Sequence, residues 1–498
     1  MEKFDEASEE IRIRRKKRAI KVFITESLMV IAVFALVIVT TLLATGYNVR
    51  PSEDGLIERT GLVQIQTMPT GANVRIDGED IFGWTNFSRS MTEGEHEIVL
   101  SRDGYETWSK TIKVSAGLYY RLSYPRLFLK NRTSESLFKL GNDEKISFAK
   151  DGNTALVYSS QKNDWRILEI NNEEVKTKDF DVSEFFDGVT DENKKDLALA
   201  TRLEKNLEIV AWSGNSERVL MKNKNEWLII DLKDLKDSVN LSKDFELTFS
   251  DVKIANDSAS ELYVVADGNL RKVDVNDEKI SSAFVHNVRD FSNLKSDLVY
   301  VADDNSDGEF EVGVFRGGEK KGSEISINFG EIVLDDGSKK NAEVKKLSFS
   351  EYFGDYYVSF ITSNNEWQIY RFSDLKKSVD DGEFTRIYSE KVDDVKNIEI
   401  RGGGELIVAN FNNSMNVFDI EAEQVATVSK LEKNGWLDEH MIYFVSDGEL
   451  KVSDFDGANF HEMTDDFLED AEVKISKNNR YMYYVSKSNK LSRIKIMD

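Results

Sequence analysis

The feature that most constrains this chain is an uncharged, apolar run of 23 residues, Ser27–Val49, between Glu26 and Arg50. A helix rises about 1.5 Å per residue, so this run is long enough to cross the ~30 Å hydrocarbon core of a bilayer. We therefore expect a single transmembrane helix over residues 27–49, preceded by a cytoplasmic tail of residues 1–26.

The residues before the apolar run predict its orientation. Lys and Arg resist translocation, so a basic flank favours a cytoplasmic N-terminus and extracytoplasmic C-terminal domains at a plasma membrane. A second expected role of this flank is contact with anionic lipid. The topology determinants are seven side chains: Arg12, Arg14, Arg15, Lys16, Lys17, Arg18 and Lys21.

A cleaved secretory signal is the alternative to a retained anchor. The apolar core of a signal peptide is usually about 7–15 residues long, which is shorter than this run. Leu42–Gly46 also offers only a poor small-residue cleavage site. The sequence therefore favours the retained anchor.

Charge and residue usage exclude several classes of function. The net charge of −24 divides into +3 for residues 1–21 and −27 for the remainder. A surface this acidic repels nucleic acid, so we expect no nucleic-acid partner. The chain has no cysteine and four scattered histidines, which excludes disulfides and thiolate zinc sites and predicts no metal and no cofactor.

Residues 50–60 are polar and are interpreted as a juxtamembrane linker. From Gly61 onward apolar and polar residues alternate, as in Leu62–Thr67 and Asn73–Asp77, and turns are expected at Asp77-Gly78 and Asp103-Gly104. This pattern predicts a small antiparallel β-sandwich over residues 61–122.

The opening of this module, Gln66–Gly78, resembles the start of a PEGA domain, with Thr70 in place of the family's Glu. Glu93-Gly94-Glu95-His96 and Arg102-Asp103-Gly104-Tyr105 resemble later motifs of that family in the correct order. The resemblance covers residues 61–117. It implies an envelope-associated binding module without catalytic activity, and the exposed loop residue Trp84 is its possible partner contact.

Residues 123–498 are repetitive. Three segments nearly copy one another, around Trp165, Trp227 and Trp367. Short apolar strands recur about 46 residues apart on average, a period typical of four-stranded propeller blades. The eight candidate strands are Ala155–Tyr158, Val219–Met221, Leu262–Val265, Leu298–Val301, Tyr356–Phe360, Leu406–Ala409, Ile442–Val445 and Tyr481–Val485.

The fold class is therefore mainly β: one N-terminal transmembrane helix, a PEGA-like sandwich, and a β-propeller of eight blades, with seven as the alternative. The repeats resemble TolB-type or WD40-like propellers at superfamily level. A short helix is expected at 190–203 and an extra hairpin around 335–338. The last blade is one strand short, so we expect Leu127–Leu140 to supply the missing strand and close the ring.

Other motifs predict structure more than chemistry. Asp303–Gly308 begins like a calcium loop, but Val314 stands where the bidentate Glu is needed, so we interpret it as an acidic hairpin tip. The three repeated tryptophans are interpreted as packing residues between blades. Arg401–Glu405 is rich in glycine but lacks the Lys-Ser/Thr of a phosphate loop and is interpreted as a turn. The sequence contains no catalytic constellation.

These patterns predict a membrane-anchored, extracytoplasmic scaffold or binding protein of a bacterial cell envelope that is not an enzyme. Its partners would be the bilayer, through residues 27–49, and an envelope protein or polysaccharide. The alternatives are an envelope hydrolase, lyase or peptidase with carboxylates in the propeller funnel, and an ectodomain sensor. Acidic side chains converging in an axial pocket would favour the enzyme, whereas a mixed lining would favour binding.

Overall fold

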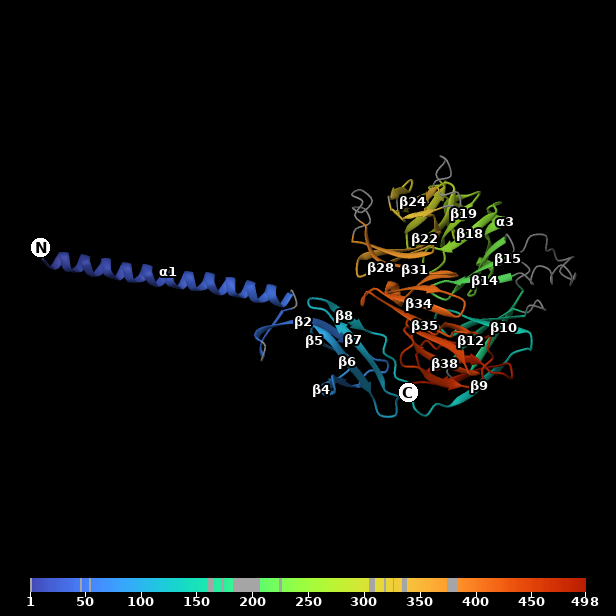
Figure 1. The fold of residues 1–498 in the computed structure, drawn as a ribbon, viewed down its shortest axis with the longest axis horizontal. Helices are drawn as coiled ribbons and strands as arrows, with labels where there is room; N and C mark the ends of the chain where they lie inside the picture. Colours follow the sequence, from blue (N-terminus) through green and yellow to red (C-terminus); the bar gives the residue numbers. More distant parts are fainter. Residues whose placement is uncertain are drawn as a thin grey trace. The chain divides into compact units, whose positions relative to one another are not determined.

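A computed structural model describes most of the chain (Figure 1). The chain divides into two compact units, Met1–Lys130 and Asn131–Asp498, and each is considered by itself below. The described residues are 2–44, 47–52, 55–159, 165–171, 174–181, 207–223, 226–303, 310–317, 319–325, 327–333, 338–373 and 384–498.

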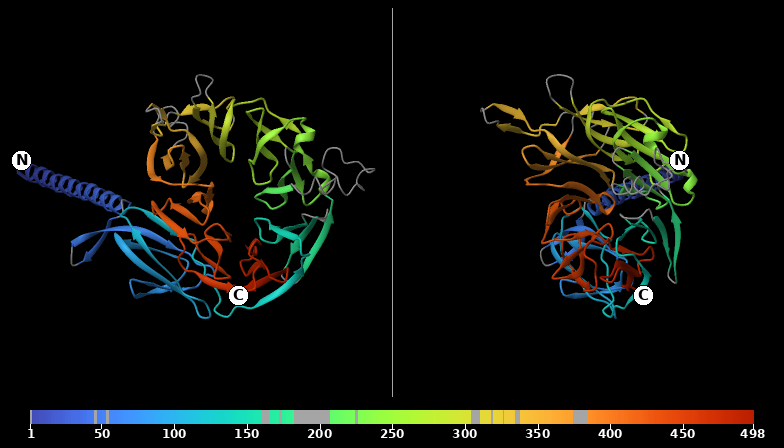
Figure 2. Two further views of the ribbon diagram at one scale, coloured as in Figure 1. Left: turned by 45° about the vertical axis from the view of Figure 1, so that its right-hand side comes forward. Right: turned by 90° about the vertical axis from the view of Figure 1, so that its right-hand side faces the viewer.

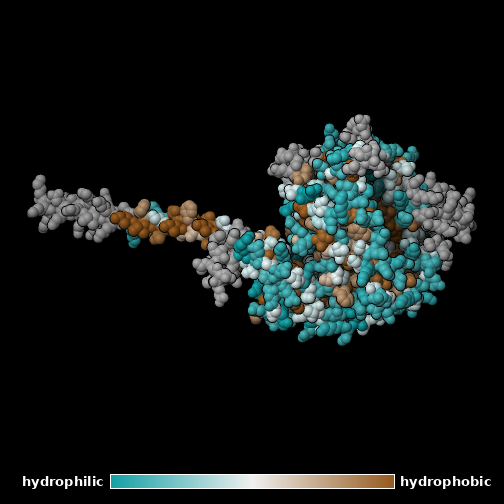
Figure 3. Space-filling view, viewed as in Figure 1, coloured by the Kyte–Doolittle hydropathy of each residue, from teal (hydrophilic) through white to brown (hydrophobic). Residues whose placement is uncertain are grey.

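The N-terminal element is the helix α1 (Glu2–Ala44). Its apolar stretch is Ile20–Thr41, with a mean hydropathy of 2.7 and no burial against the protein, and it is the brown band of the helix in Figure 3. The Thr25 and Thr40 hydroxyls donate back to the carbonyls of Lys21 and Leu36 at 2.8 and 2.9 Å, so both hydroxyls are satisfied within the helix. The helix fits a single-pass anchor or a signal peptide.

The predicted bounds of this span and of the linker after it are wrong. The helix ends at Ala44, and the strand β1 (Tyr47–Ser52) pairs antiparallel with β2 (Gly55–Ile65), Val49 lying opposite Ile57. Tyr47 and Val49 are aromatic and β-branched, which suits a strand. Residues 50–60, interpreted as a linker from their polarity, are thus largely the continuation of a sheet.

Two sheets form the sandwich of the first unit. One has the order β1-β2-β5, with β8 beside β2, and the other has the order β4-β3-β6-β7. The pairing of β8 with β2 is parallel, so the predicted sandwich is not entirely antiparallel. The remaining bounds are β3 (Asn73–Ile76), β4 (Glu79–Trp84), β5 (Phe87–Thr92), β6 (Gly94–Ser101), β7 (Trp108–Val114) and β8 (Tyr119–Leu122).

The alternation in the sequence builds the core of this sandwich. Val63 and Ile65 on β2 are fully buried, as are Ile98 and Leu100 on β6. Residues after β8 still belong to this unit, because Leu127 N–H donates to the Met68 carbonyl at 2.8 Å and other backbone bonds continue to Lys130. The unit therefore ends at Lys130 and not at residue 122.

In the part of residues 131–498 that the structure describes, eight four-stranded antiparallel sheets follow one another around a common centre (Figure 2, left). The first four sheets are β10 (Glu144–Phe148), β11 (Thr154–Ser159), β12 (Trp165–Ile170), β13 (Val175–Phe180); β14 (Leu207–Trp212), β15 (Arg218–Asn223), β16 (Glu226–Asp231), β17 (Val239–Asn240); β18 (Phe249–Ile254), β19 (Glu261–Ala266), β20 (Asn269–Asp274), β21 (Lys279–Ile280); and β22 (Val288–Leu294), β23 (Asp297–Asp303), β24 (Phe310–Phe315), β25 (Ser323–Ile325).

The other four complete the ring, and the whole unit is a β-propeller. They are β28 (Val344–Tyr352), β29 (Asp355–Thr362), β30 (Glu366–Phe372), β31 (Thr385–Lys391); β32 (Asn397–Arg401), β33 (Leu406–Asn410), β34 (Ser414–Asp419), β35 (Gln424–Ser429); β36 (Asn434–Trp436), β37 (Met441–Ser446), β38 (Glu449–Asp454), β39 (His461–Thr464); and β40 (Lys474–Ile475), β41 (Tyr481–Val485), β42 (Lys490–Lys495) with β9 (Ser134–Lys139).

Each of the eight apolar strands singled out in the sequence is the second strand of its sheet. Such a strand is covered on both faces by neighbouring sheets, which is why it is continuously apolar. The core is correspondingly divided into clusters between adjacent sheets. One cluster joins Leu156 and Ile167 of the first sheet to Val219 and Leu228 of the second.

The repeated tryptophans have the predicted packing role. Trp165, Trp227 and Trp367 all lie at the start of the third strand of a sheet and are at most 3% exposed. Each belongs to a cluster between two sheets. The indole N–H of Trp227 donates to the Phe249 carbonyl of the next sheet at 2.8 Å.

The ring is closed by the strand that the sequence predicted. β9 pairs antiparallel with β42, and Ser492 lies opposite Ser136. A buried cluster that contains Leu491 of the last sheet and Phe148 of the first continues the core across this junction. The closing strand is shorter than the predicted Leu127–Leu140, because residues 127–130 bond to the first unit.

Short elements complete the structure. The expected extra hairpin is present as β26 (Glu331–Val333) and β27 (Lys339–Asn341). The second sheet carries the one-turn helices η2 (Leu235–Asp237) and α3 (Leu241–Asp244). The helix expected at 190–203 and residues 304–308 of the calcium-like loop lie outside the described residues.

Candidate functional site

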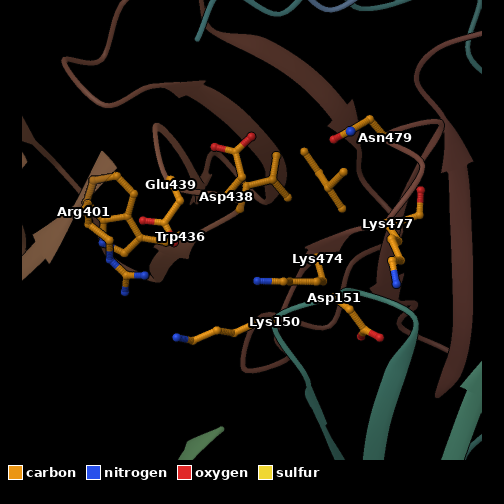
Figure 4. Close-up of a pocket in the computed structure, with 12 residues that line it drawn as sticks. Lys150, Asp151, Arg401, Trp436, Asp438, Glu439, Lys474, Lys477 and Asn479 are labelled. Carbon is orange, nitrogen blue, oxygen red and sulfur yellow. The ribbon is translucent and has the colours of Figure 1, made fainter. Parts of the chain in front are cut away.

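A cavity of about 300 Å³ lies among the first strands of four sheets and the turns that follow them (Figure 4). The fourth and fifth sheets meet chiefly through their first strands, as do the fifth and sixth, and the first strands face the centre of the ring (Figure 2, left). Lys150 follows β10, Arg401 ends β32, Trp436 ends β36 and Lys474 begins β40. We call these four residues and the space between them the basic pocket.

A glycine turn positions Arg401. Gly402 and Gly404 form the ends of the 3-10 turn η3 (Gly402–Gly404) and have φ angles of 63° and 111°, in the region that favours glycine. A Cβ on Gly404 would lie 2.1 Å from the Glu351 carbonyl. The interpretation of this segment as a turn is confirmed, and the turn places Arg401 at the pocket.

The Arg401 guanidinium is held from two sides. Its Nε and Nη2 atoms donate to Oε2 of Glu399 at 3.1 and 2.6 Å. Its central carbon lies 5.1 Å from the centre of the Trp436 ring, in a cation–π contact. Within the described residues Nη1 has no hydrogen bond, so this edge of the guanidinium remains available for an acceptor.

The two lysines of the basic pocket approach the same space. In Figure 4 the ammonium groups of Lys150 and Lys474 point toward the Arg401 guanidinium, whereas Lys477 lies on the opposite side of the cavity and its ammonium does not point toward Arg401. Burial lowers the pKa of Lys474 and the nearby charge of Arg401 lowers it further, while Glu472, Glu439 and Asp438 oppose this shift. Burial also raises the pKa of Glu472, so both members of this pair are shifted toward neutrality.

The acidic side chains that line the cavity are already bonded to the backbone. Asp151 Oδ1 accepts from the N–H groups of Asn153 and Thr154, both at 3.0 Å. Asp438 Oδ1 accepts from the N–H groups of residues 440 and 441, both at 2.8 Å. Oε2 of Glu439 accepts from the N–H of residue 402 at 3.2 Å. The lysines, in contrast, have no ion pair in the described part of the chain.

A buried pair lies beside this pocket. His440 Nε2 is 3.0 Å from Oε2 of Glu405, whose side chain is only 5% exposed. Burial disfavours the charged imidazole, but the hydrogen bond and the charge of Glu405 outweigh it and raise the pKa of His440. Because His440 precedes β37 and Glu405 precedes β33, the pair joins the sixth and seventh sheets.

The residues selected from the sequence lie elsewhere. Trp84 is 69% exposed at the end of the edge strand β4, next to the fully exposed Phe82. Its role as a partner contact remains a prediction. The seven basic topology determinants lie on α1, and Lys21, whose side chain is described, is exposed. In the described residues no group of three or more His, Asp or Glu side chains could hold a metal ion.

A repeated turn of the propeller carries Lys150. The backbone bonds from Ala149 to Thr154, Ser213 to Arg218 and Ser476 to Tyr481 close equivalent turns between first and second strands. Lys150 and Lys477 occupy the same position in this repeated turn. The repeat therefore places Lys150 in a turn between a first and a second strand, but it does not distinguish Lys150 from Lys477 and does not predict the pocket.

Comparisons with known proteins bear on the two units separately. Residues 60–126 match the family model of the PEGA domain, as the sequence motifs predicted. No curated protein matches the chain.

Several solved structures are similar to the chain. One is PorZ, an essential bacterial surface component of the type-IX secretion system of Porphyromonas gingivalis, with 13% identity, a TM-score of 0.39, and coverage of 71% of this chain and 42% of PorZ. The chain thus spans less than half of PorZ. A second is a chain of the yeast Nup82–Nup159–Nup116 nucleoporin complex, with 9% identity, a TM-score of 0.42, and coverage of 65% and 98%. A third is the β-propeller domain of Cps50 (Swd1) from Myceliophteria thermophila, with 10% identity, a TM-score of 0.38, and coverage of 74% and 100%. Nothing about function follows from likenesses of this degree.

Proposed function

We propose that this chain is a membrane-anchored, extracytoplasmic binding protein of a bacterial cell envelope. Its ring holds a protein or polysaccharide partner, and the PEGA module acts as a spacer or second contact. The apolar helix, none of which is buried, and the basic flank before it support the anchor and the orientation. Anchoring also keeps the ring at a high local concentration near the membrane.

The observation that carries the binding proposal is the lining of the basic pocket. Hydrolysis by a carboxylate pair needs one group to donate a proton and another to act as base or nucleophile. Asp151, Asp438 and Glu439 accept backbone N–H groups, which holds these carboxylates in place. Free ammonium groups beside an aromatic ring suit recognition, so we propose binding without catalysis.

A capture experiment with the full-length protein tests this proposal. The protein is reconstituted in nanodiscs, immobilised, and exposed separately to envelope polysaccharide and to detergent-extracted envelope protein. Wild-type protein is compared with the double variant K150Q/K474Q, with W84A, and with K477Q as the charge-matched control. We expect one fraction to bind wild type, W84A and K477Q, and to bind K150Q/K474Q at least ten-fold more weakly.

Two results would contradict the proposal. If W84A alone loses the bound material, the PEGA module and not the ring is the binding unit. If the polysaccharide is shortened or the protein cleaved at a rate that K150Q/K474Q abolishes, the pocket is catalytic.

A further inference from the structure

We propose that the basic pocket binds a small anionic group, a carboxylate or a phosphate, through Lys150, Arg401 and Lys474. This inference rests on the proposed function and assigns the chemical class of the ligand. The three cations come from the first, sixth and eighth sheets and point into one space (Figure 4). A single anion placed there would contact all three sheets.

The first support is the charge of the surroundings. Outside residues 1–21 the chain carries a net charge of −27, so its surface as a whole repels anions. Against this background Lys150, Arg401 and Lys474 form a local group of cations, in a cavity that Asp151, Asp438 and Glu439 also line. In the described residues these acids form no direct ion pair with the two lysines, and they accept backbone N–H groups.

The second support is the arrangement of Arg401. Glu399 engages Nε and Nη2, and Trp436 lies against one face of the guanidinium, so the group is fixed before any ligand arrives. The free Nη1 edge offers N–H donors in a plane, which matches the oxygens of a carboxylate or phosphate. A fixed donor loses little side-chain entropy on binding.

The third support is the size of the cavity. About 300 Å³ lies at the lower end of the volumes of small-molecule sites. This volume suits one acidic group with a ring-sized body, such as a sugar acid or the end of a polymer. The indole of Trp436 provides an apolar surface for that body.

Lys474 should couple anion binding to the uptake of a proton. Its ammonium faces Arg401, Glu472, Glu439 and Asp438, and burial lowers its pKa. A bound anion favours the charged form and raises this pKa, so binding takes up a proton when the pH lies between the pKa values of the free and bound states. Affinity for the anion should therefore fall as the pH rises through the pKa of the free protein.

Isothermal titration calorimetry of the full-length protein in a non-ionic detergent tests the proposal. The probes are glucuronate, its neutral counterpart glucose, and inorganic phosphate, in a low-salt Bis-Tris chloride buffer. We expect glucuronate or phosphate, but not glucose, to bind at one site. K474Q and K150Q should each weaken binding at least ten-fold, and K477Q should change it less than two-fold. Whichever of glucuronate and phosphate binds more tightly identifies the carboxylate or the phosphate as the preferred group.

The proposal is overturned if neither anion binds wild type, if glucose binds equally well, or if K477Q weakens binding as much as K474Q does. The last result would mean that only net charge matters. If neither glucuronate nor phosphate binds in the calorimeter, but K150Q/K474Q does not capture the partner that wild type captures, the proposed function stands and the ligand class is wrong. If the anions bind but the partner is captured equally by K150Q/K474Q, the anion site stands and the proposed function has the wrong binding site.

Discussion

Tryptophan side chains in this chain occupy opposite environments. Trp367 is fully buried between the fifth and sixth sheets, and its indole N–H donates to Ser359 Oγ at 2.7 Å, whereas Trp84 is 69% exposed. Truncating a buried tryptophan costs about 3–5 kcal/mol through lost contacts and the cavity left behind. We predict that W367A lowers the thermal midpoint of the ring by several degrees and that W84A leaves it unchanged. A calorimetric scan of the two variants decides this, and equal midpoints would contradict the packing role.

His440 makes the stability of the ring depend on pH. Its pKa is raised in the folded state by Glu405, against the effect of burial, and Asp438 and Glu439 act in the same direction as Glu405. The stabilisation is therefore complete below the unfolded-state pKa of about 6.5 and is lost as the pH rises through the higher folded-state pKa. A hydrogen bond to a charged group contributes roughly 1.5–3 kcal/mol.

The corresponding variant is H440Q, which keeps a polar group but cannot titrate. We predict that the difference in thermal midpoint between wild type and H440Q is larger at pH 6 than at pH 9. If the difference in thermal midpoint between wild type and H440Q is the same at pH 6 and at pH 9, this pair does not titrate in the folded protein.

At the scale of elements, the sequence correctly predicted the strands that are buried on both faces. The second strands of the sheets, such as Leu262–Val265, are apolar on both faces because both face other sheets. The prediction from sequence was wrong where a polar segment forms regular structure. Residues 50–60 read as a linker because they are polar, yet their pairing in β1 and β2 comes from the backbone.

The closing strand can be tested with cysteines, because the chain has none of its own. Ser136 on β9 and Ser492 on β42 lie opposite each other across the antiparallel pair. Directly opposed residues have Cβ atoms about 4.5–5.5 Å apart, near the range that a disulfide bridges. We predict that S136C/S492C forms an intramolecular disulfide under mild oxidation and raises the thermal midpoint of the ring.

The single variants S136C and S492C are the controls, and non-reducing gel mobility with thiol titration is the measurement. If both thiols stay free under conditions that oxidise exposed cysteines, the ring is not closed by β9.

At the scale of the whole molecule, the pocket could not be predicted because its residues are far apart in the sequence. Lys150 and Lys474 are brought together only by the closure of the ring between the last and first sheets. Turn residues vary more than strand residues, so the repeat pattern that predicted the blades is silent about which turns carry cations. The sequence signal for the apolar helix, in contrast, is local and contiguous.

We propose that the first helix keeps the ring tethered to the membrane. The most direct measurement is mass spectrometry of the protein recovered from membranes after an alkaline carbonate wash. We predict that the full-length chain remains in the pellet and yields peptides from residues 1–44. A soluble chain that has lost those residues would contradict the anchor and identify the helix as a cleaved signal.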